Sequence, residues 1–432
     1  MNRRDFLGLS AGVSLAAAAG LSPAEAADTS PQKTNETIQR ARQAALAILK
    51  PTARQLEHGL ELHAASLVFE SYGFSPRAAW DGDALGKAAL AGASPVELED
   101  LREEMTMTRA ATDVAERAEY LAAWKAAGVT CISQNAGEES QDPMRLIKRL
   151  ARFTYVTDRL RDFVSRAVTP EDVVAAKQQG KHCLYFSGNG VPLAQRWESL
   201  EGELSYIRIF FQLGIRMMHM TYNRRNMIGD GCAEPANAGL SDFGRAAVAE
   251  MNRVGVIADV AHSGWQTSLE TAKASSRPMV ASHSACDGLH HHIRCKPDRV
   301  IKAIADTGGY VGICCIPAFL GGQGDIQAML DHLDYAVRRF GAEHVAIGTD
   351  VAYTSRNMAA ESKKVPKTGP TRPRWESFWP PGALDFRGQP LSLAWTNWPL
   401  FTVGMVQRGY SDADIQRILG GNVMRVARAA LA

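Results

Sequence analysis

The sequence lacks the patterns that mark several common classes of protein. Its seven cysteines are scattered with no CxxC pair, which argues against a disulfide scaffold. Its 48 basic and 46 acidic residues leave a net charge of +2, so there is no electrostatic footprint for nucleic acid or an anionic membrane. After the first 27 residues no run reaches about 18 consecutive apolar residues, so we expect no membrane span in the mature chain. What remains is an ordinary globular composition, 46% hydrophobic and 22% charged.

Residues 1–27 have the features of a targeting segment. Arg3-Arg4 is followed by an apolar run and then by Ala24-Glu25-Ala26, an A-x-A cleavage signature. The twin arginine resembles a twin-arginine (Tat) export signal, with a general secretory signal or a retained anchor as the alternatives. We therefore expect a twin-arginine-type signal peptide at 1–27, the Tat machinery as a partner, and a periplasmic or secreted mature protein.

Eight short apolar runs, separated by helical patterns, predict a parallel sheet. Runs of this kind, bounded by Gly or Pro, are typical of buried parallel strands. They are Leu67–Ser71, Val129–Ser133, Lys181–Ser187, Ile215–Thr221, Val256–Val260, Met279–Ala281, Tyr310–Cys314 and His344–Ile347. Eight strand–helix units favour an α/β fold, a (β/α)₈ TIM-type barrel with its functional residues at the C-terminal rim. An open doubly wound sheet is the alternative, but the Gly-rich loop typical of it does not follow the first run.

The rest of the chain is expected to flank this barrel. Residues 28–66 are interpreted as a lead-in, polar up to residue 43, followed by a helix. The barrel domain is expected to span 67–432 and to end in a C-terminal helix. Residues 354–393, rich in Pro and Lys, are expected to form a long insertion over the rim. Trp375, Phe378 and Trp379 within it are candidates to line a substrate pocket.

Polar side chains follow three of the predicted strands where each strand ends. His262 and His283 follow the fifth and sixth runs, and Asp350 follows the eighth. Two neutral imidazoles with a carboxylate or water suit zinc, and Asp350 is the natural third member, as ligand or as base. A single histidine at a strand end is more often a structural residue whose hydrogen bonds are satisfied than a metal ligand. Arg294, soon after the sixth run, can grip a substrate carboxylate; a surface arginine is the alternative.

Two other groups of histidine are expected to have structural roles. The run His290–His292 follows no predicted strand and is interpreted as a solvated loop. His219 falls inside the fourth run and is interpreted as a packed polar residue.

Six segments between residues 214 and 426 share their order and spacing with a known family. They are LGIRMMHMTYNRRNMIGDG, GLSDFGRAAVAEMNRVGVIADVAHSG, PMVASHSA, HIRCKPDRVIKAIADTGGYVGI, HVAIGTD and GYSDADIQRILGGNVMRV. In these segments the chain resembles the renal (membrane) dipeptidase family, peptidase family M19. The resemblance implies an exported metallohydrolase on a metallo-dependent hydrolase barrel, with a two-zinc site that cleaves dipeptides and in some members a β-lactam bond.

The resemblance also implies roles for individual residues. His262 and His283 match the two histidines that bind one zinc ion. Asp350 matches the aspartate that handles the catalytic water and its proton. Arg294 matches the arginine that holds the terminal carboxylate of the substrate.

The sequence departs from the family at four positions. Tyr72 and Phe74 stand where the family has a His-x-Asp pair that binds the other zinc ion. Asn189 lies where a bridging glutamate is expected, and Tyr222 replaces a histidine that polarises the scissile carbonyl. Because two neighbouring zinc ions need carboxylates to offset their charge, these replacements argue against a two-zinc centre. We expect at most one zinc ion.

These observations lead to one main functional expectation and two alternatives. We expect a membrane-dipeptidase-like metallohydrolase in which Asp350 accepts a proton from the attacking water, Tyr222 or Asn189 supports the oxyanion, and Arg294 holds the substrate carboxylate. The first alternative is a metal-independent member that uses Asp350 and His262 as acid and base. The second is a periplasmic small-ligand-binding protein that kept the barrel and lost catalysis. A homodimer is an open expectation.

Overall fold

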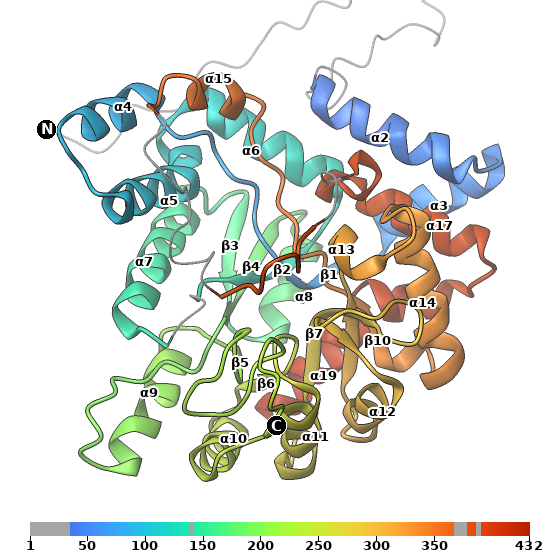
Figure 1. Cartoon of the computed structure of the whole chain (residues 1–432). Coiled ribbons are helices and arrows are strands. Elements are labelled where there is room, and N and C mark those ends of the chain that lie inside the picture. Colours follow the sequence, from blue (N-terminus) through green and yellow to red (C-terminus); the bar gives the residue numbers. More distant parts are fainter. Residues whose placement is uncertain (1–34, 138–140, 367–377, 386–389) are drawn as a thin grey trace, which may run out of the picture.

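The computed structural model describes residues 35–137, 141–366, 378–385 and 390–432, and its strands form a ring surrounded by helices (Figure 1). The strands are β1 (Phe69–Gly73), β2 (Cys131–Asn135), β3 (Val164–Ala167), β4 (His182–Gly188), β5 (Met217–His219), β6 (Ile257–Asp259), β7 (Val280–Cys286), β8 (Cys295–Lys296), β9 (Tyr310–Ile313) and β10 (Val345–Ile347). Their order around the ring is β1-β2-β4-β5-β6-β7-β9-β10, and all neighbours pair in parallel. The (β/α)₈ barrel expected from the sequence is confirmed, and each of the eight predicted runs contains or overlaps one strand of the ring.

The helices cover the outside of the ring and one of its ends (Figure 1). The α-helices are α2 (Glu36–Leu49), α3 (Ala53–Ala65), α4 (Gly82–Leu90), α5 (Pro95–Thr112), α6 (Val114–Ala127), α7 (Pro143–Arg159), α8 (Pro170–Gln178), α9 (Leu200–Gln212), α10 (Asp242–Val254), α11 (Trp265–Ala274), α12 (Asp298–Asp306), α13 (Pro317–Leu320), α14 (Ile326–Phe340), α15 (Met358–Ser362), α17 (Trp398–Gln407), α18 (Asp412–Gln416) and α19 (Asn422–Leu431). Short turns η1 (Ala342–His344), η2 (Leu391–Leu393), η3 (Trp395–Asn397) and η4 (Arg417–Gly421) complete the elements. Among the described residues no helix is long and apolar enough to cross a bilayer.

Local sequence signals explain where the helices next to the site begin and end. The Ser241 side chain accepts a hydrogen bond from the Gly244 N–H at the start of α10, and Asp325 caps α14 in the same way. Gly255 ends α10 with a φ of 97°, a left-handed conformation that glycine adopts without steric cost. The chain then turns directly into β6, which carries the residues that lead to the site.

The sequence does not predict β3. This strand pairs with the first half of β4, whereas Ser187 and Gly188 at the far end of β4 pair with β5. Only the two end residues of β3, Val164 and Ala167, are buried, whereas Ser165 is partly exposed and Arg166 is exposed. Such a short segment lacks the continuous apolar run that identifies the other strands of the wall.

The N-terminal helix begins earlier than the sequence predicts. The polar segment up to residue 43 is expected to be irregular, but α2 starts at Glu36. The Asn35 side chain accepts hydrogen bonds from the first turn of α2, and its amide nitrogen donates to Glu119 on α6. That cap and anchor explain why a polar composition is compatible with a helix here. A left-handed residue, Lys50, then separates α2 from α3.

Glu70 joins the first strand of the ring to the segment after the last. The Thr349 N–H donates to Glu70 Oε1 at 3.1 Å, and Trp395 Nε1 donates to Oε2 at 2.8 Å. The carboxyl group is fully buried, and burial raises its pKa to about 8, although the bonds from Thr349 and Trp395 act in the opposite direction. Next to it, the Asp350 N–H donates to the Tyr72 carbonyl at 3.3 Å.

The raised pKa of Glu70 predicts a loss of stability with increasing pH. The unfolded carboxyl ionises near its ordinary pKa of 4.5, while the folded one keeps its proton up to about 8. Between these values the contribution of Glu70 to the free energy of unfolding should fall by up to about 1.4 kcal/mol per pH unit. Urea unfolding from pH 5 to 9 should show this slope in the wild type and not in Glu70→Gln. The exposed Glu57→Gln is the control, and parallel profiles for wild type and Glu70→Gln would contradict the prediction.

Candidate functional site

A cavity of about 670 Å³ opens at the C-terminal ends of the strands. Its lining includes one polar or aromatic side chain from each of five strand ends, namely Tyr72 (β1), Asn189 (after β4), Tyr222 (after β5), His262 (after β6) and Asp350 (after β10). Parallel strands bring their carboxyl ends to one rim, which is where barrel proteins place functional groups. Of the residues expected to carry chemistry, Asn189, Tyr222, His262 and Asp350 therefore meet in one cavity.

His262, which lines this cavity, is in contact with His283, which lies beneath it. Their Nε2 atoms are 2.9 Å apart, and the other nitrogen of each ring has its own partner. His262 Nδ1 lies 2.7 Å from the Asn223 side-chain oxygen, and His283 Nδ1 lies 2.8 Å from the Ser282 hydroxyl. Because Asn223 Oδ1 only accepts, His262 carries its proton on Nδ1 and presents an unprotonated Nε2.

Both imidazoles are held in the neutral form. Burial lowers the pKa of His262 and of His283 well below the ordinary value, and the positive charge of Arg294 acts in the same direction. A neutral imidazole is the form that binds a metal ion.

Arg294 lies below the cavity and not among its lining residues. Its side chain is fully buried, and its guanidinium donates to the Ala261 carbonyl, to the His283 carbonyl at 3.2 Å and to His262 Nε2 at 3.2 Å. These bonds hold the two histidine segments together. Its role in binding a substrate carboxylate stays a prediction, and this role would require the guanidinium to leave these partners.

Two tyrosines cover the faces of the two histidines. The Tyr72 ring stacks on His283 with centroids 3.8 Å apart, and the Tyr222 ring stacks on His262 at 4.1 Å. The Tyr72 hydroxyl donates to Asn189 Oδ1 at 2.6 Å. Phenol rings therefore fill places where the resemblance expects histidines, and an amide fills the place of the bridging glutamate. A two-zinc centre does not fit these residues, because no carboxylate among those that the structure describes is placed to bridge two ions.

Two further residues, His219 and Asp259, belong to the same cluster. His219 Nε2 lies 2.7 Å from Asp259 Oδ2, and ligand atoms of His219, Asp259 and His283 all lie within 4.8 Å of one another. All three side chains are fully buried. His219 is packed, as the sequence predicts, but it faces the site. The missing signal is strand register: His219 on β5 pairs with Asp259 on β6, which the sequence alone does not give.

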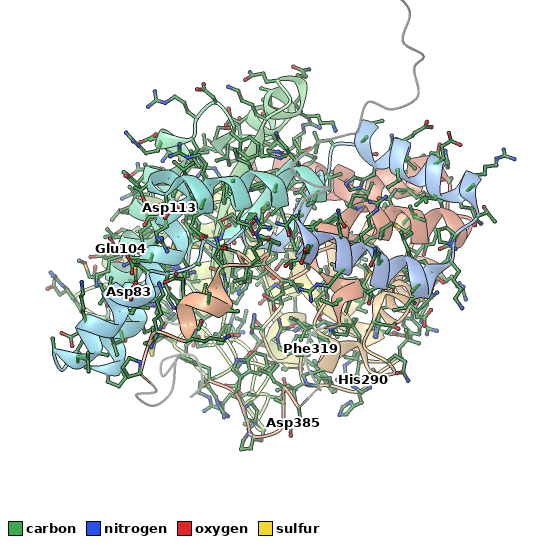
Figure 2. The ribbon with its side chains drawn as sticks, turned by 90° about the horizontal axis from the view of Figure 1, so that it is seen from above. Asp83, Glu104, Asp113, His290, Phe319 and Asp385 are labelled. Atoms are coloured by element: carbon green, nitrogen blue, oxygen red, sulfur yellow. The ribbon has the colours of Figure 1, made fainter. Side chains whose placement is uncertain are left out.

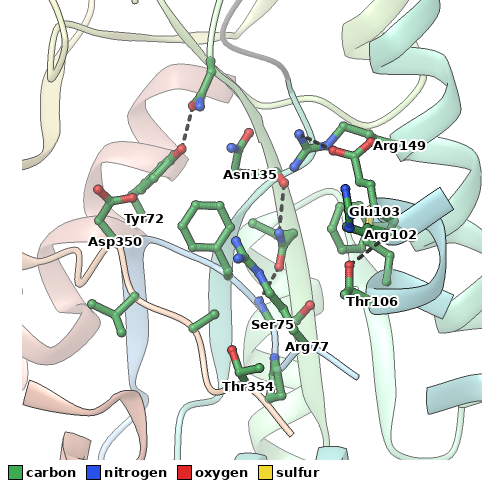
Figure 3. Close-up of a pocket in the computed structure, with 18 of the residues that line it drawn as sticks. Tyr72, Ser75, Arg77, Arg102, Glu103, Thr106, Asn135, Arg149, Asp350 and Thr354 are labelled. Atoms are coloured by element: carbon green, nitrogen blue, oxygen red, sulfur yellow. Dashed lines mark hydrogen bonds and ion pairs between the residues drawn. The ribbon is translucent and has the colours of Figure 1, made fainter. Parts of the chain in front are cut away.

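Asp350 has an unusual backbone conformation. Its φ is 58°, in the left-handed region, and its carboxylate lines the cavity beside Tyr72 (Figure 3). Aspartate tolerates this conformation better than most residues, and strained backbone is concentrated at functional sites. The observation supports the role expected for Asp350 at the rim.

The opposite wall of the cavity is rich in guanidinium groups. Arg102, Glu103 and Arg149 from α5 and α7 face the cavity across from Tyr72 and Asp350 (Figure 3). Arg149 pairs with Glu103 at 3.2 Å. Burial raises the pKa of the Glu103 carboxyl, but the guanidinium groups of Arg149, Arg145 and Arg152 outweigh it and leave the pKa lowered overall.

The insertion reaches the rim, as the sequence predicts. Trp379 lines the cavity, and the Phe378 ring contacts Tyr222 edge-on at 5.5 Å. Trp375 lies outside the described residues. The run His290–His292 forms a partly exposed loop, and His290 lies at the edge of the molecule, away from Asp83 and Glu104 (Figure 2). The interpretation of this run as a solvated loop is confirmed.

Comparisons with known proteins agree on one family. The model of the membrane dipeptidase family (peptidase family M19) matches residues 94–366, which is more than half of the chain. Dipeptidase tcpJ of Claviceps purpurea is 26% identical over 276 residues, or 62% of this chain and 55% of that protein. The chain spans about half the length of the curated relatives it matches.

Solved structures share the fold. An amidohydrolase from Pseudomonas aeruginosa has a TM-score of 0.62 at 24% identity, over 86% of this chain and 98% of that one. A metallopeptidase from Rhodobacter sphaeroides, bound to a phosphinate mimic of the dipeptide L-Ala-D-Ala, has a TM-score of 0.58 at 16% identity, over 84% and 99%.

The burial of the two central histidines predicts that neither takes up a proton near neutral pH. In metal-free protein, the ring ¹⁵N signals of His262 and His283 should stay in the neutral form from pH 8 to about 5.5, because their pKa values lie well below 6.5. Loss of each signal in His262→Gln or His283→Gln gives the assignment. Since the unfolded rings do bind protons below about 6.5, stability should fall as the pH falls through that region. A ring that titrates near 6.5 in folded protein would contradict the prediction.

Proposed function

Because the chain belongs to the membrane dipeptidase family, peptidase family M19, we propose that it is a metallohydrolase that cleaves a dipeptide or a related small amide. The observation that carries the proposal is the meeting of His262, Asp350 and Tyr222 in one cavity at the rim. A volume of about 670 Å³ suits a small ligand. The relative solved with a dipeptide mimic supports this substrate class.

The proposed site binds at most one zinc ion. His262 and His283 are the proposed ligands, since their neutral Nε2 atoms lie 2.9 Å apart and one ion can accept both. When bound, such an ion supplies a Lewis acid and lowers the pKa of water.

The remaining steps fall to side chains of the cavity. Asp350 is the proposed base, because its carboxylate lines the cavity and can take the proton of the attacking water. Tyr222 is proposed to donate to the oxyanion that forms at the scissile carbonyl. Asn189 gives its oxygen to Tyr72, which leaves the amide nitrogen as the group that can donate to a bound substrate.

Substrate anchoring is proposed to involve the guanidinium wall. A dipeptide has a terminal carboxylate, and Arg294 is already engaged by Ala261, His262 and His283 below the cavity. Arg102 lines the cavity, and burial lowers the pKa of its guanidinium without removing its charge near neutral pH. We therefore propose Arg102 as a carboxylate-binding residue in addition to Arg294.

The cellular setting is proposed from residues 1–27. The twin arginine and the A-x-A signature support export by the Tat route to the periplasm or beyond.

Replacement of the proposed base should abolish hydrolysis. Asp350→Asn keeps a residue that tolerates the left-handed backbone, so its melting temperature should stay close to that of the wild type. In a dipeptide screen kcat/KM should fall by about 100-fold or more. The exposed Asp158→Asn is the control and should retain full activity.

Two outcomes of that screen would overturn the proposal. Equal activity in wild type and Asp350→Asn would remove Asp350 from the chemistry. A wild type that hydrolyses no dipeptide, with or without added zinc, but is stabilised by dipeptides would favour a ligand-binding barrel, consistent with its missing carboxylates.

Arg102→Gln should weaken substrate binding more than it slows the chemical step. KM for dipeptides should rise about tenfold with little change in kcat, because the guanidinium would contact the carboxylate in both the ground state and the transition state. Arg159→Gln, on the exposed end of α7, is the control. A dipeptide with its C-terminus amidated should lose the difference between wild type and variant; a difference that persists would argue against this role.

A further inference from the structure

Below the cavity, an imidazole, a carboxylate and a second imidazole converge in the core of the barrel. His219 from β5, Asp259 from β6 and His283 from β7 present ligand atoms that all lie within 4.8 Å of one another. None of the three side chains is exposed to solvent. Neither His219 nor Asp259 is among the residues that the family resemblance marks as ligands.

Several polar atoms of this cluster lack a hydrogen bond. Among the described residues, neither ring nitrogen of His219 completes a hydrogen bond, and nor does Asp259 Oδ2. His219 Nε2 and Asp259 Oδ2 lie 2.7 Å apart but without the alignment of a hydrogen bond. A buried polar group that makes no hydrogen bond costs roughly 1–3 kcal/mol, so these three atoms together point to a further ligand at the cluster.

The surrounding bonds orient the free atoms toward the interior of the cluster. Asp259 Oδ1 accepts hydrogen bonds from the N–H groups of Ala261 at 2.9 Å and Ser282 at 3.0 Å, which leaves Oδ2 for another partner. The Ser282 hydroxyl holds His283 Nδ1, which turns His283 Nε2 toward the cluster, where it lies 2.9 Å from His262 Nε2. Outer partners of this kind fix the orientation of metal ligands.

The spacing of the three imidazoles agrees with coordination of one ion. The His219 ring centroid lies 5.3 Å from those of His262 and His283, which are 4.9 Å from each other. Imidazoles bound tetrahedrally at a Zn–N distance of about 2.0–2.1 Å have centroids about 5 Å apart.

We propose that His219, Asp259 and His283 bind one divalent transition-metal ion, such as zinc, in the core of the barrel. Histidine nitrogen and carboxylate oxygen are ligands that suit zinc, and three protein ligands leave a fourth position. His262 lines the cavity on the open side of the cluster and would stand next to that fourth position. In this proposal His219 and Asp259 replace the ligands that the family resemblance expects from strand one and from the bridging glutamate. The claim that this ion is the catalytic metal rests on the proposed function. The claim that the cluster binds an ion does not.

The charge of the cluster limits the site to a single ion. Asp259 is its one carboxylate, and the Arg294 guanidinium lies close by, 3.2 Å from His262 Nε2. A second divalent ion would add two positive charges with no further carboxylate to offset them.

Metal titration of the full-length protein tests the proposal without any activity assay. Protein stripped with a chelator is titrated with Co²⁺, followed by its visible absorption, and its zinc content is measured after reconstitution. We expect one ion per chain. Asp259→Asn keeps an oxygen for the Ala261 and Ser282 N–H groups and should weaken binding at least tenfold, as should His219→Gln.

Two controls separate this site from other histidines. His63→Gln removes a buried histidine that bonds Thr402 and the Ala127 carbonyl, and it should leave the affinity unchanged. Replacing His290, His291 and His292 by Ala removes the histidines of the exposed loop as an adventitious site and should also leave one ion bound. Circular dichroism and thermal melts establish that each variant is folded.

Three results would overturn the proposal. Folded wild type that takes up no Co²⁺ or Zn²⁺ would exclude the site. Unchanged affinity in both Asp259→Asn and His219→Gln would place the ion elsewhere, and so would loss of binding in His262→Gln alone. If those variants fail to fold, anomalous scattering from zinc-soaked wild-type crystals decides, with the ion expected about 2.0–2.2 Å from all three ligands. Protein that binds the ion but hydrolyses no dipeptide would contradict the proposed function and leave this site intact.

Discussion

The site depends on the way in which Asp259 is held. Its Oδ1 accepts two backbone N–H groups, one from Ala261 just after β6 and one from Ser282 on β7. These bonds tie the ends of neighbouring strands together and fix the carboxylate in the core. The pKa of Asp259 is lowered overall, because its interaction with His219 and the bonds from Ser282 outweigh the effect of burial. A fixed negative charge at the centre of the ring is what allows the imidazoles to gather around it.

The pocket above this charge has a different chemical character from the two-zinc centre that the family resemblance implies. Tyr72 and Tyr222 stand where the resemblance expects histidines and stack their rings on His283 and His262, and the neutral Asn189, bonded to Tyr72, stands where it expects a glutamate. Burial therefore lowers the pKa of His262, and little negative charge lies nearby to offset this effect. Catalysis in such a pocket relies on hydrogen bonds and on a single ion, not on a pair of ions with a shared carboxylate.

Much of the fold and part of the site are predictable from the sequence. Buried strands are recognisable in a sequence as apolar runs. The ring of strands, and the positions of His262 and His283 at strand ends, can therefore be predicted from local patterns. Strand register does not follow from local patterns, so the sequence alone does not predict that His219 pairs with Asp259. Burial of Arg294 was also beyond local patterns, because an arginine after a strand reads as a surface residue unless the carbonyl groups around it are known. The short β3 lacks an apolar run and left no signal.

The seam of the barrel has a consequence for its behaviour in alkali. The first strand meets the segment after the last one through the Glu70 carboxyl, Thr349 and a backbone bond from Asp350 to Tyr72. Tyr72 and Asp350 also form one wall of the pocket. Ionisation of Glu70 places an unsolvated charge directly behind that wall. The mouth of the molecule should therefore loosen before the rest of the ring does, so that loss of ligand affinity at high pH would precede any change in secondary structure.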